Sequence, residues 1–572
     1  MGQVMLQICS GKLFQRNVEY RNQLRGVIYT NLRLPRDETL QTVAGSLLPT
    51  SSLGPSNAVV YEIEELIEST GAGKQPGVLV SHGIDPYIND FSAVLSFALN
   101  CTASPSYALT DRLLGDQRGL STFSTPKKVV KRTFDADVYC KAEECEYLSS
   151  FTDQLIGLNR KTYLGVMRAI RTYVTGMHRI ADDFELAYTL LVASLESLAQ
   201  DFDGHKATWL DYDHGKRKVV DNALSEVDDE ASEKVRAAIL EIEHTSLGRR
   251  FRDFSSMYIK PSFYRDEAVG LLNPIGEADL KKALSKAYHA RSQYIHKLRR
   301  LPDQLTTTQS YADTCRIGKD TWLTIQGLSR LARHVIAEFI MRQPTVDEEV
   351  YDYSLERAGV ALLPLAPQYW VSKINFDSGS GARKLEGFLS QLADHMFQNK
   401  GAVITDLKDL LIELEDRFDN LEKSEKLSFS TLYVLFNRIV SPEQRTERFE
   451  QFVSRLEKPL HGPSPQSNLL HLIFNIVPSW NVEDHYACLM GYFKTRDNKL
   501  EVRAPKLFEV GMLLQLAERY RESGKYETAV QLIGMAVDNY PGHSALIEFE
   551  RDFDKDVEIN WKDIMLPKPE VE

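Results

Sequence analysis

The sequence has few cysteines and no long run of apolar residues. Only six cysteines occur in 572 residues, too few and too scattered for the disulfide framework of a small secreted domain. No stretch approaches the roughly 18 uninterrupted apolar residues of a membrane-spanning helix. The first residues, which include Gln3, Gln7 and Lys12, lack the basic-then-apolar plan of a secretory signal. We therefore expect a protein of the reducing cytoplasm with no membrane partner.

Sequence motifs for metals and nucleotides are incomplete. Cys140 and Cys145 have no second pair of ligands nearby, so we interpret them as packed thiols and not as a zinc site. The glycine-rich string at residues 71–75 is not a P-loop. Glu68 stands where the first glycine of that motif would fall, and Gln75 replaces the hydroxyl that binds magnesium.

A loop rich in Asp and His follows at residues 201–214. It contains Asp201, Asp203, His205, Asp211, Asp213 and His214. The loop lacks the third ligand and the closing glutamate of a calcium loop, and its His–Asp spacing fits no zinc pattern. We interpret it as a polar connection between helices, and we expect no metal or other cofactor.

Acidic residues are missing from one segment of an otherwise acidic chain. The net charge is −12, which argues against a protein that coats nucleic acid nonspecifically. Residues 281–300, however, contain no Asp or Glu and carry seven basic residues, Lys281, Lys282, Lys286, Arg291, Lys297, Arg299 and Arg300. This local reversal of sign indicates a polyanionic ligand.

The length and the 43% hydrophobic content allow two to four domains with sizeable cores. Residues 1–149 are predicted to form a mixed, mainly β domain. Short runs rich in β-branched residues occur there, separated by Gly, Pro, Ser and Asn, at residues 4–8, 26–33, 58–63 and 77–82. We place the first domain boundary near residue 150 and the second after residue 345, where the sequence becomes irregular.

Residues 150–345 are predicted to form a helical domain. Apolar periodicity favours helices at residues 159–173, 184–199, 218–245, 250–260 and 320–341. The helix at 184–199 is apolar on nearly all sides and should lie centrally in the bundle. Glu196, near the end of that helix, either orients a basic active-site residue or forms a structural ion pair.

Residues 346–572 are predicted to form a second helical domain. Helices are expected at residues 383–399, 403–422, 429–440, 444–457, 466–476 and 484–494. The spacing of a tetratricopeptide (TPR) repeat then follows, in Ala517, Tyr520, Gly524, Tyr526, Ala529, Ala536 and Pro541. One repeat cannot bury its own face, so it must pack on the preceding helices. Such helices are a candidate docking site for a peptide or protein trigger.

The most informative pair of residues is Arg291 and His296. Histidine titrates near neutrality and can move a proton at a ribose 2′-hydroxyl or a leaving 5′-oxygen. Arginine stays charged and can hold phosphate oxygens in a fork, so this pair needs no metal. Positions five apart on a helix point about 140° away from each other. A kink, the long arginine stem or a second copy of the helix must therefore bring them together.

The neighbours of this pair are also candidates for RNA contact. His289, Ser292 and His296 share one helix face, since offsets of four and seven residues return to it. Arg-x4-His strings are nevertheless common by chance, and a helical Arg or His is usually a solvated or satisfied residue. The spacing alone therefore leaves both interpretations open.

The helix at 184–199, together with the later helix that carries Tyr288, Arg291 and His296, resembles the HEPN superfamily, specifically its Apea-like domains. The similarity covers residues 150–342, about a third of the chain. It implies a HEPN helical bundle over these residues. Together with the patterns of the flanking regions, this predicts a mainly α protein, in which an N-terminal β-rich domain precedes the HEPN bundle and a TPR-like helical region follows it. Ser292 follows the arginine where active members often have Asn, Asp or His, and Lys297 follows the histidine where glycine is frequent.

The resemblance implies a metal-independent endoribonuclease that acts as a homodimer and leaves 2′,3′-cyclic phosphate and 5′-hydroxyl ends. It further implies a regulated toxin, typical of prokaryotic defence against phage. The catalytic residues would be Arg291, His296 and Ser292, supported by Glu196 and Tyr288. The RNA-binding residues would be Lys286, His289, Lys297, Arg299 and Arg300. Unpaired RNA loops, as in tRNA or mRNA, are the expected substrate because their bases and 2′-hydroxyls are accessible.

Two alternatives remain from the sequence. One is a catalytically inactive interaction or scaffold protein that dimerises through the HEPN domain and docks a partner on its C-terminal repeats. The other is a metal-dependent hydrolase that uses the loop at 201–214. For the ribonuclease, we expect removal of the Arg291 guanidinium to abolish cleavage while largely sparing the fold.

Overall fold

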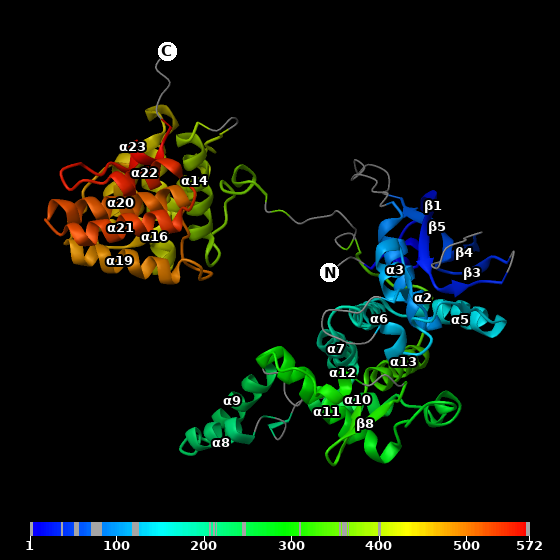
Figure 1. Ribbon diagram of the computed structural model, residues 1–572. Helices are drawn as coiled ribbons and strands as arrows, with labels where there is room; N and C mark the ends of the chain where they lie inside the picture. The colour runs from blue at the N-terminus through cyan, green and yellow to red at the C-terminus, as the bar shows by residue number, and fades with distance from the viewer. Residues whose placement is uncertain are drawn as a thin grey trace. The chain divides into compact units, whose positions relative to one another are not determined.

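The structure is a computed structural model that describes residues 4–35, 38–50, 57–69, 83–116, 125–204, 208–209, 212, 214–242, 247–307, 311–353, 356, 363, 365–398 and 402–567. The chain divides into two compact units, residues 1–362 and 363–572, and each has its own hydrophobic core. The protein is mainly α with a small N-terminal antiparallel sheet (Figure 1), which confirms the expected fold class at this level. No described helix has the length and apolar character needed to cross a membrane.

The sheet of the first unit is built on two long strands. Its strands lie in the order β3 (Leu40–Thr42), β4 (Gly45–Pro49), β5 (Asn57–Glu68), β1 (Val18–Thr30) and β6 (Ala103–Ser104). Along β5, buried residues alternate with more exposed ones, because successive side chains of a strand point to opposite faces. The sheet therefore has one face on the core. A separate pair, β2 (Leu32–Arg33) and β7 (Val138–Tyr139), is parallel.

The N-terminal prediction is only partly correct. The expected strands at 26–33 and 58–63 are confirmed by β1, β2 and β5. The run at 4–8 was expected to be a strand and instead leads into the helix α1 (Leu6–Cys9), because a short apolar run does not distinguish the two structures. Helix α2 (Asp85–Leu99) was not expected. The runs at 71–75 and 77–82 lie outside the described residues.

Helices form most of the rest of the first unit. They are α3 (Tyr107–Leu114), α4 (Pro126–Val129), α5 (Ala142–Gly157), α6 (Arg160–Arg179), α7 (Phe184–Phe202), α8 (His214–Ala223), α9 (Asp229–Ile242), α10 (Leu247–Met257), α11 (Glu277–Lys297), α12 (Asp303–Thr307) and α13 (Ile325–Arg342). The predicted helix at 184–199 is confirmed as α7, which is buried on most sides. The helix expected at 320–341 begins later, because β9 (Asp320–Leu323) pairs with β8 (Thr314–Ile317) as a hairpin. Helices α8 and α9 extend away from the rest of this unit (Figure 1).

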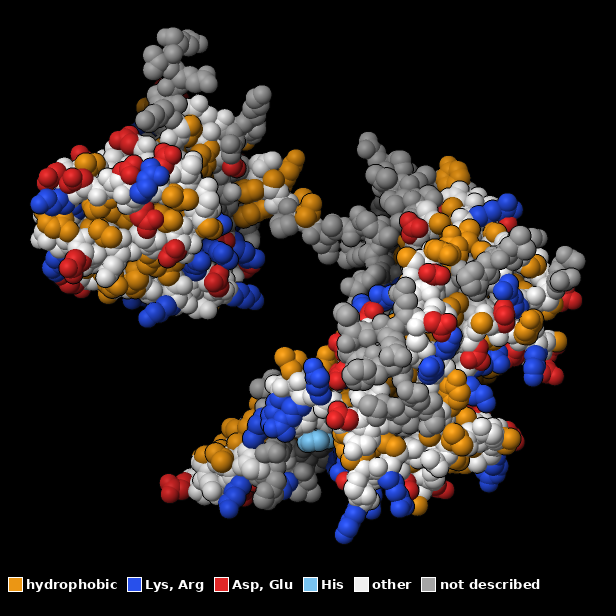
Figure 2. Space-filling view, in the orientation of Figure 1, with side chains coloured by type: hydrophobic (Ala, Val, Ile, Leu, Met, Phe, Trp, Pro, Cys, Tyr) orange, Lys and Arg blue, Asp and Glu red, His pale blue; other side chains and the backbone are white. Residues whose placement is uncertain are grey.

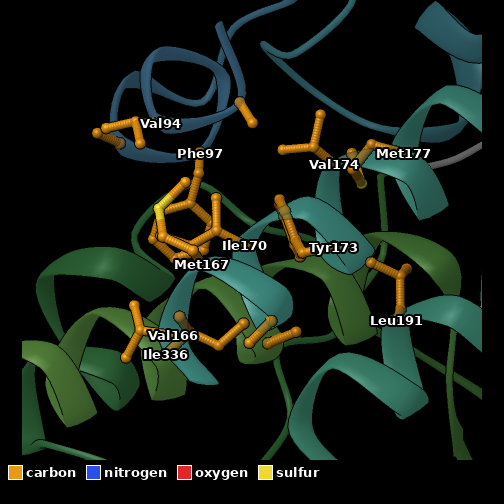
Figure 3. Close-up of a cluster of buried hydrophobic side chains, with 14 of the residues drawn as sticks. Val94, Phe97, Val166, Met167, Ile170, Tyr173, Val174, Met177, Leu191 and Ile336 are labelled. Atoms are coloured by element: carbon orange, nitrogen blue, oxygen red, sulfur yellow. The ribbon is translucent and has the colours of Figure 1, made fainter. Parts of the chain in front are cut away.

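The boundary expected near residue 150 falls inside α5, and residues 1–149 are not a separate compact unit. The reason is a shared core, in which the ring of Phe97 from α2 packs against Phe151 of α5 and Tyr173 of α6, with centroid distances of 5.9 and 5.3 Å. Figure 3 shows Val94 and Phe97 beside Met167, Ile170 and Tyr173. The helix that precedes the sheet's last strand therefore belongs to the same core as the bundle.

The second unit is entirely helical among its described residues. Its α-helices are α14 (Ser380–Met396), α15 (Lys408–Arg417), α16 (Lys423–Ile439), α17 (Phe449–Glu457), α18 (Pro465–Ile473), α19 (Val482–Thr495), α20 (Lys506–Glu522), α21 (Tyr526–Asn539), α22 (Ser544–Asp552) and α23 (Trp561–Met565). Ala517 of α20 and Ala529 and Ala536 of α21 are fully buried where these helices pair. Helix α20 also packs on α18 and α19.

A buried histidine lies at the junction of α19 and α20. The side chain of His485 is fully buried, and its Nδ1 accepts a hydrogen bond from Nη1 of Arg519 at 3.1 Å. Because arginine only donates, the ring proton must lie on Nε2. Burial, and next the charge of Arg519, lowers the pKa of His485 from 6.5 to about 3. The folded protein therefore holds this imidazole neutral.

The stability of the second unit should consequently fall as the pH falls below 6.5 toward 3, where the unfolded chain binds a proton that the folded chain does not. His485 should account for a loss of about 2 kcal/mol at pH 5. The control is His485→Asn, whose amide oxygen replaces Nδ1 as the acceptor. In unfolding titrations, the stability difference between wild type and variant should shrink by about that amount from pH 7.5 to 5. An unchanged difference would contradict the assignment.

Candidate functional site

Helix α11 carries the candidate site and packs on α7, α10 and β9. Leu280, Ala283, Leu284 and Ala287 form its buried stripe. Arg291 lies eleven residues after Leu280, which returns to within about 20° of the same direction on a helix. The periodicity of α11 therefore turns the Arg291 side chain toward the bundle and not toward solvent.

Arg291 reaches a carboxylate on α7. Its Nη2 lies 2.8 Å from Oε2 of Glu196, and the two side chains are 20% and 5% exposed. The hydroxyl of Tyr288 donates to the other oxygen of Glu196 at 3.4 Å, and the Arg291 guanidinium lies 5.9 Å from the Tyr288 ring centroid. Burial, and next the charge of Glu196, raises the pKa of Tyr288. Tyr288 therefore stays protonated and helps Glu196 to hold Arg291.

One donor of this guanidinium has no partner. The Nε atom of Arg291 is buried and makes no hydrogen bond among the described residues. Buried polar groups are nearly always paired, so an unpaired one calls for an explanation. A guanidinium N–H is a strong donor to phosphate oxygens. Because this atom is buried, an anion would reach it only after the groups that cover it move.

The opposite side of α11 faces solvent. His289 and His296 are exposed, and Ser292 between them is half-buried. No described hydrogen bond or ion pair joins Arg291 to His296. This follows from the five-residue offset, which directs one side chain inward and the other outward. Within one chain, the guanidinium and the imidazole are therefore held on different sides of the same helix.

The end of α11 is basic and exposed. Leu298 ends the helix with a φ of 50°, and its N–H donates to the carbonyl of Tyr294 at 2.8 Å. Lys297, Arg299 and Arg300 are exposed around this turn, and within the described part of the chain their side chains have no ion-pair partner. Figure 2 shows Lys and Arg side chains gathered in the region of α9 and α11, with a histidine close by.

Lys286 differs from the other predicted RNA-binding residues. Its Nζ lies 2.6 Å from Oδ2 of Asp320 and 5.8 Å from the Trp322 ring centroid, both on β9. This lysine therefore fastens the β8–β9 hairpin to α11. Asp320 is distant in sequence and belongs to a segment expected to be helical, so sequence reasoning had no signal for this pair.

In the segment at residues 201–214, the aspartates whose side chains are described at the end of α7 form ion pairs with arginines. Asp201 pairs with Arg168 at 3.0 Å, and Asp203 pairs with Arg250 at 2.6 Å. These pairs tie the end of α7 to α6 and α10. No group of three His, Cys, Asp or Glu side chains suited to a metal occurs among the described residues. His205, Asp211 and Asp213 lie outside them, and nothing is described of the His214 side chain.

Sequence reasoning missed a second link between α7 and α11. The hydroxyl of Tyr294 donates to Oδ2 of Asp183 at 3.3 Å, while Oδ1 of Asp183 caps the start of α7 through the Leu186 N–H. An Asp before an apolar helix is a recognisable cap, but its second partner depends on the tertiary fold.

Neither a family model, a curated protein nor a solved structure matches this chain.

Proposed function

We propose that this protein is a metal-independent endoribonuclease of the HEPN type, with its site on α11. The observation that carries the proposal is the state of Arg291, a largely buried guanidinium held by Glu196 while its Nε has no acceptor among the described residues. Its helix has an exposed histidine and a basic end. A phosphate at this end would lie near a guanidinium, which can stabilise negative charge, and an imidazole, which can transfer a proton.

The proposed reaction is attack of a ribose 2′-oxygen on the adjacent phosphorus. The bond from phosphorus to the 5′-oxygen breaks, which gives a 2′,3′-cyclic phosphate and a 5′-hydroxyl. His296 would move one proton, either from the 2′-hydroxyl or to the 5′-oxygen. Arg291 would stabilise the negative charge that develops on the phosphate oxygens. Lys297, Arg299, Arg300 and His289 would hold the neighbouring phosphates, and Ser292 lies between the two histidines.

We propose further that the working site is composite and lies between two copies of the chain. Arg291 and His296 leave α11 in directions about 140° apart, and a twofold-related α11 supplies the missing group across an isologous interface. The exposed apolar side chains of Ile295 and Leu298, 47% and 76% exposed, lie at the same end of the helix. They are suited to such a contact.

Complementation of two inactive variants tests the composite site. One is His296→Ala, and the other is Arg291→Ala combined with Glu196→Gln. A mixed dimer retains one arginine and one histidine in a single intact composite site. An equimolar mixture should therefore recover about a quarter of wild-type cleavage, since half of the dimers are mixed and each has one of two sites. No recovery, with mixed dimers confirmed by native mass spectrometry, would contradict a shared site.

The alternative is a catalytically inactive interaction protein. The same Arg291–Glu196 pair favours this alternative, because a guanidinium that is already paired can have the structural role of holding α11 against α7. RNA cleavage in excess chelator separates the candidates. A ribonuclease of the proposed type remains active, a metal-dependent hydrolase that uses the loop at 201–214 becomes inactive, and an interaction protein never cuts.

The resemblance also supports a biological role, which we include in the proposal. The protein would be a cytoplasmic toxin of a prokaryotic antiphage system whose activity is controlled until infection. Helices α20 and α21 pair with each other, and their small and aromatic residues follow the sequence spacing of a TPR repeat. These two helices would bind a peptide or protein trigger. Their small buried residues let the helices approach closely, which is the geometry that such repeats require.

A further inference from the structure

Two cysteine side chains meet at the start of α5. The Sγ atoms of Cys140 and Cys145 are 3.1 Å apart, and both thiols are free. Cys140 directly follows β7, Lys141 is the residue just before α5, and Cys145 lies in the first turn of that helix. The turn from strand to helix folds the chain back on itself and brings the two sulfur atoms together.

The backbone around this pair is well anchored. The N–H of Cys140 donates to the carbonyl of Arg33 at 2.9 Å, and the N–H of Lys141 donates to Oε2 of Glu144 at 3.1 Å. The other oxygen of Glu144 accepts from Arg132 at 2.5 Å. A disulfide requires a sulfur–sulfur distance of about 2.05 Å, so the two side chains need to close by only about 1 Å.

This proximity is specific to the two residues. The Sγ atoms of Cys9 and Cys101 donate to the carbonyls of Leu6 and Leu95 instead. All six cysteines lie in the described part of the chain, and no other sulfur–sulfur contact occurs there. The rest of the cysteines are therefore isolated thiols, and one pair alone is placed for an intramolecular bond.

We propose that Cys140 and Cys145 form a reversible disulfide when the native protein meets a low-molecular-weight disulfide such as oxidised glutathione. One cysteine thiolate attacks a sulfur of the oxidant, forms a mixed disulfide and releases one thiol. The second cysteine then attacks the sulfur of the first and releases the other thiol. Two cysteine thiols lose two electrons and two protons, and the oxidant is reduced to two thiols.

Exposure sets the order of these attacks. Cys145 is partly exposed and accessible to the oxidant, whereas Cys140 is 8% exposed. Burial also raises the pKa of the Cys140 thiol, which lowers its thiolate fraction and its reactivity toward a dissolved oxidant. Cys145 is therefore the first to react, and Cys140 resolves the mixed disulfide from 3.1 Å away.

Peptide mapping of the full native chain tests this proposal, because Lys141 separates the two cysteines for trypsin. The protein is treated with oxidised glutathione, its free thiols are blocked with N-ethylmaleimide, and it is digested without reduction. We expect peptides 133–141 and 142–160 to be joined, with a mass about 2 Da below the sum of the two thiol peptides. Dithiothreitol should release them.

Single variants test the order of attack. Cys140→Ser should retain glutathione on Cys145, since the resolving thiol is absent. Cys145→Ser should acquire no adduct at Cys140, since that thiol is buried. The proposal is overturned if the wild type keeps glutathione on Cys145 or if residues 140 and 145 are both recovered as blocked free thiols. An adduct on Cys140 in the Cys145→Ser variant would overturn the order.

Discussion

Replacing Arg291 by alanine is expected to lower the free energy of unfolding by about 3 kcal/mol, the cost of leaving one partner of a buried ion pair without the other. Glu196 would remain in the core with a side chain only 5% exposed. Within the part of the chain that the structure describes, Tyr288 would be its one remaining donor, at a long distance of 3.4 Å. The sequence alone led us to expect that this substitution would largely spare the fold. The contact with α7 changes that expectation.

A second substitution separates the structural role of Arg291 from its proposed chemical role. Combining Arg291→Ala with Glu196→Gln removes the orphaned charge, so most of the lost stability should return. RNA cleavage should not return, because the guanidinium is still missing. Denaturant unfolding and cleavage rates measured on the same preparations decide between the roles. If cleavage recovers together with stability, Arg291 acts only through the fold.

Leu195 directly precedes Glu196 on α7, and its replacement by alanine provides a reference for these losses of stability. Leu195 is fully buried, and its truncation should cost about 2 to 5 kcal/mol through a cavity. It removes no group from the proposed chemistry. A destabilised Leu195→Ala protein that still cleaves RNA while folded would show that lost stability alone does not explain an inactive Arg291 variant.

Local periodicity predicted α7, whereas the helix that carries Arg291 and His296 was expected from the family resemblance and not from its apolar pattern. The apolar pattern of α7 is strong enough to be recognised without tertiary information, and its length was correct to within a few residues. Helix geometry also places His296 about 140° away from Arg291, but only the structure shows that Arg291 is the one turned toward the buried stripe of α11. Glu196 was recognised as a partner for a basic residue, although its partner was not identified.

Contacts between segments that are distant in the chain could not be predicted from the sequence. The Lys286–Asp320 pair depends on a hairpin at 314–323, and the link from Tyr294 to Asp183 joins residues 111 positions apart. The boundary near residue 150 was misplaced for the same reason. A change from strand-like to helical texture does not show whether both parts share one core, as Phe97 and Tyr173 do.

Metal-free cleavage of RNA tests the central claim most directly. The purified full chain is incubated in excess chelator with an RNA that contains unpaired loops, beside an all-deoxy strand of the same sequence. We expect cleavage of the RNA alone, with 2′,3′-cyclic phosphate and 5′-hydroxyl ends. His296→Ala should lower the rate by about 100- to 10,000-fold, as expected for loss of a general acid–base group.

The matched control is His461→Ala, which removes an exposed histidine of the second unit and should cleave at the wild-type rate. We expect chelator-resistant cleavage that depends on His296 and on the substrate 2′-hydroxyl. Cleavage that stops when metals are removed, that persists in His296→Ala, or that is absent from the wild type would contradict it.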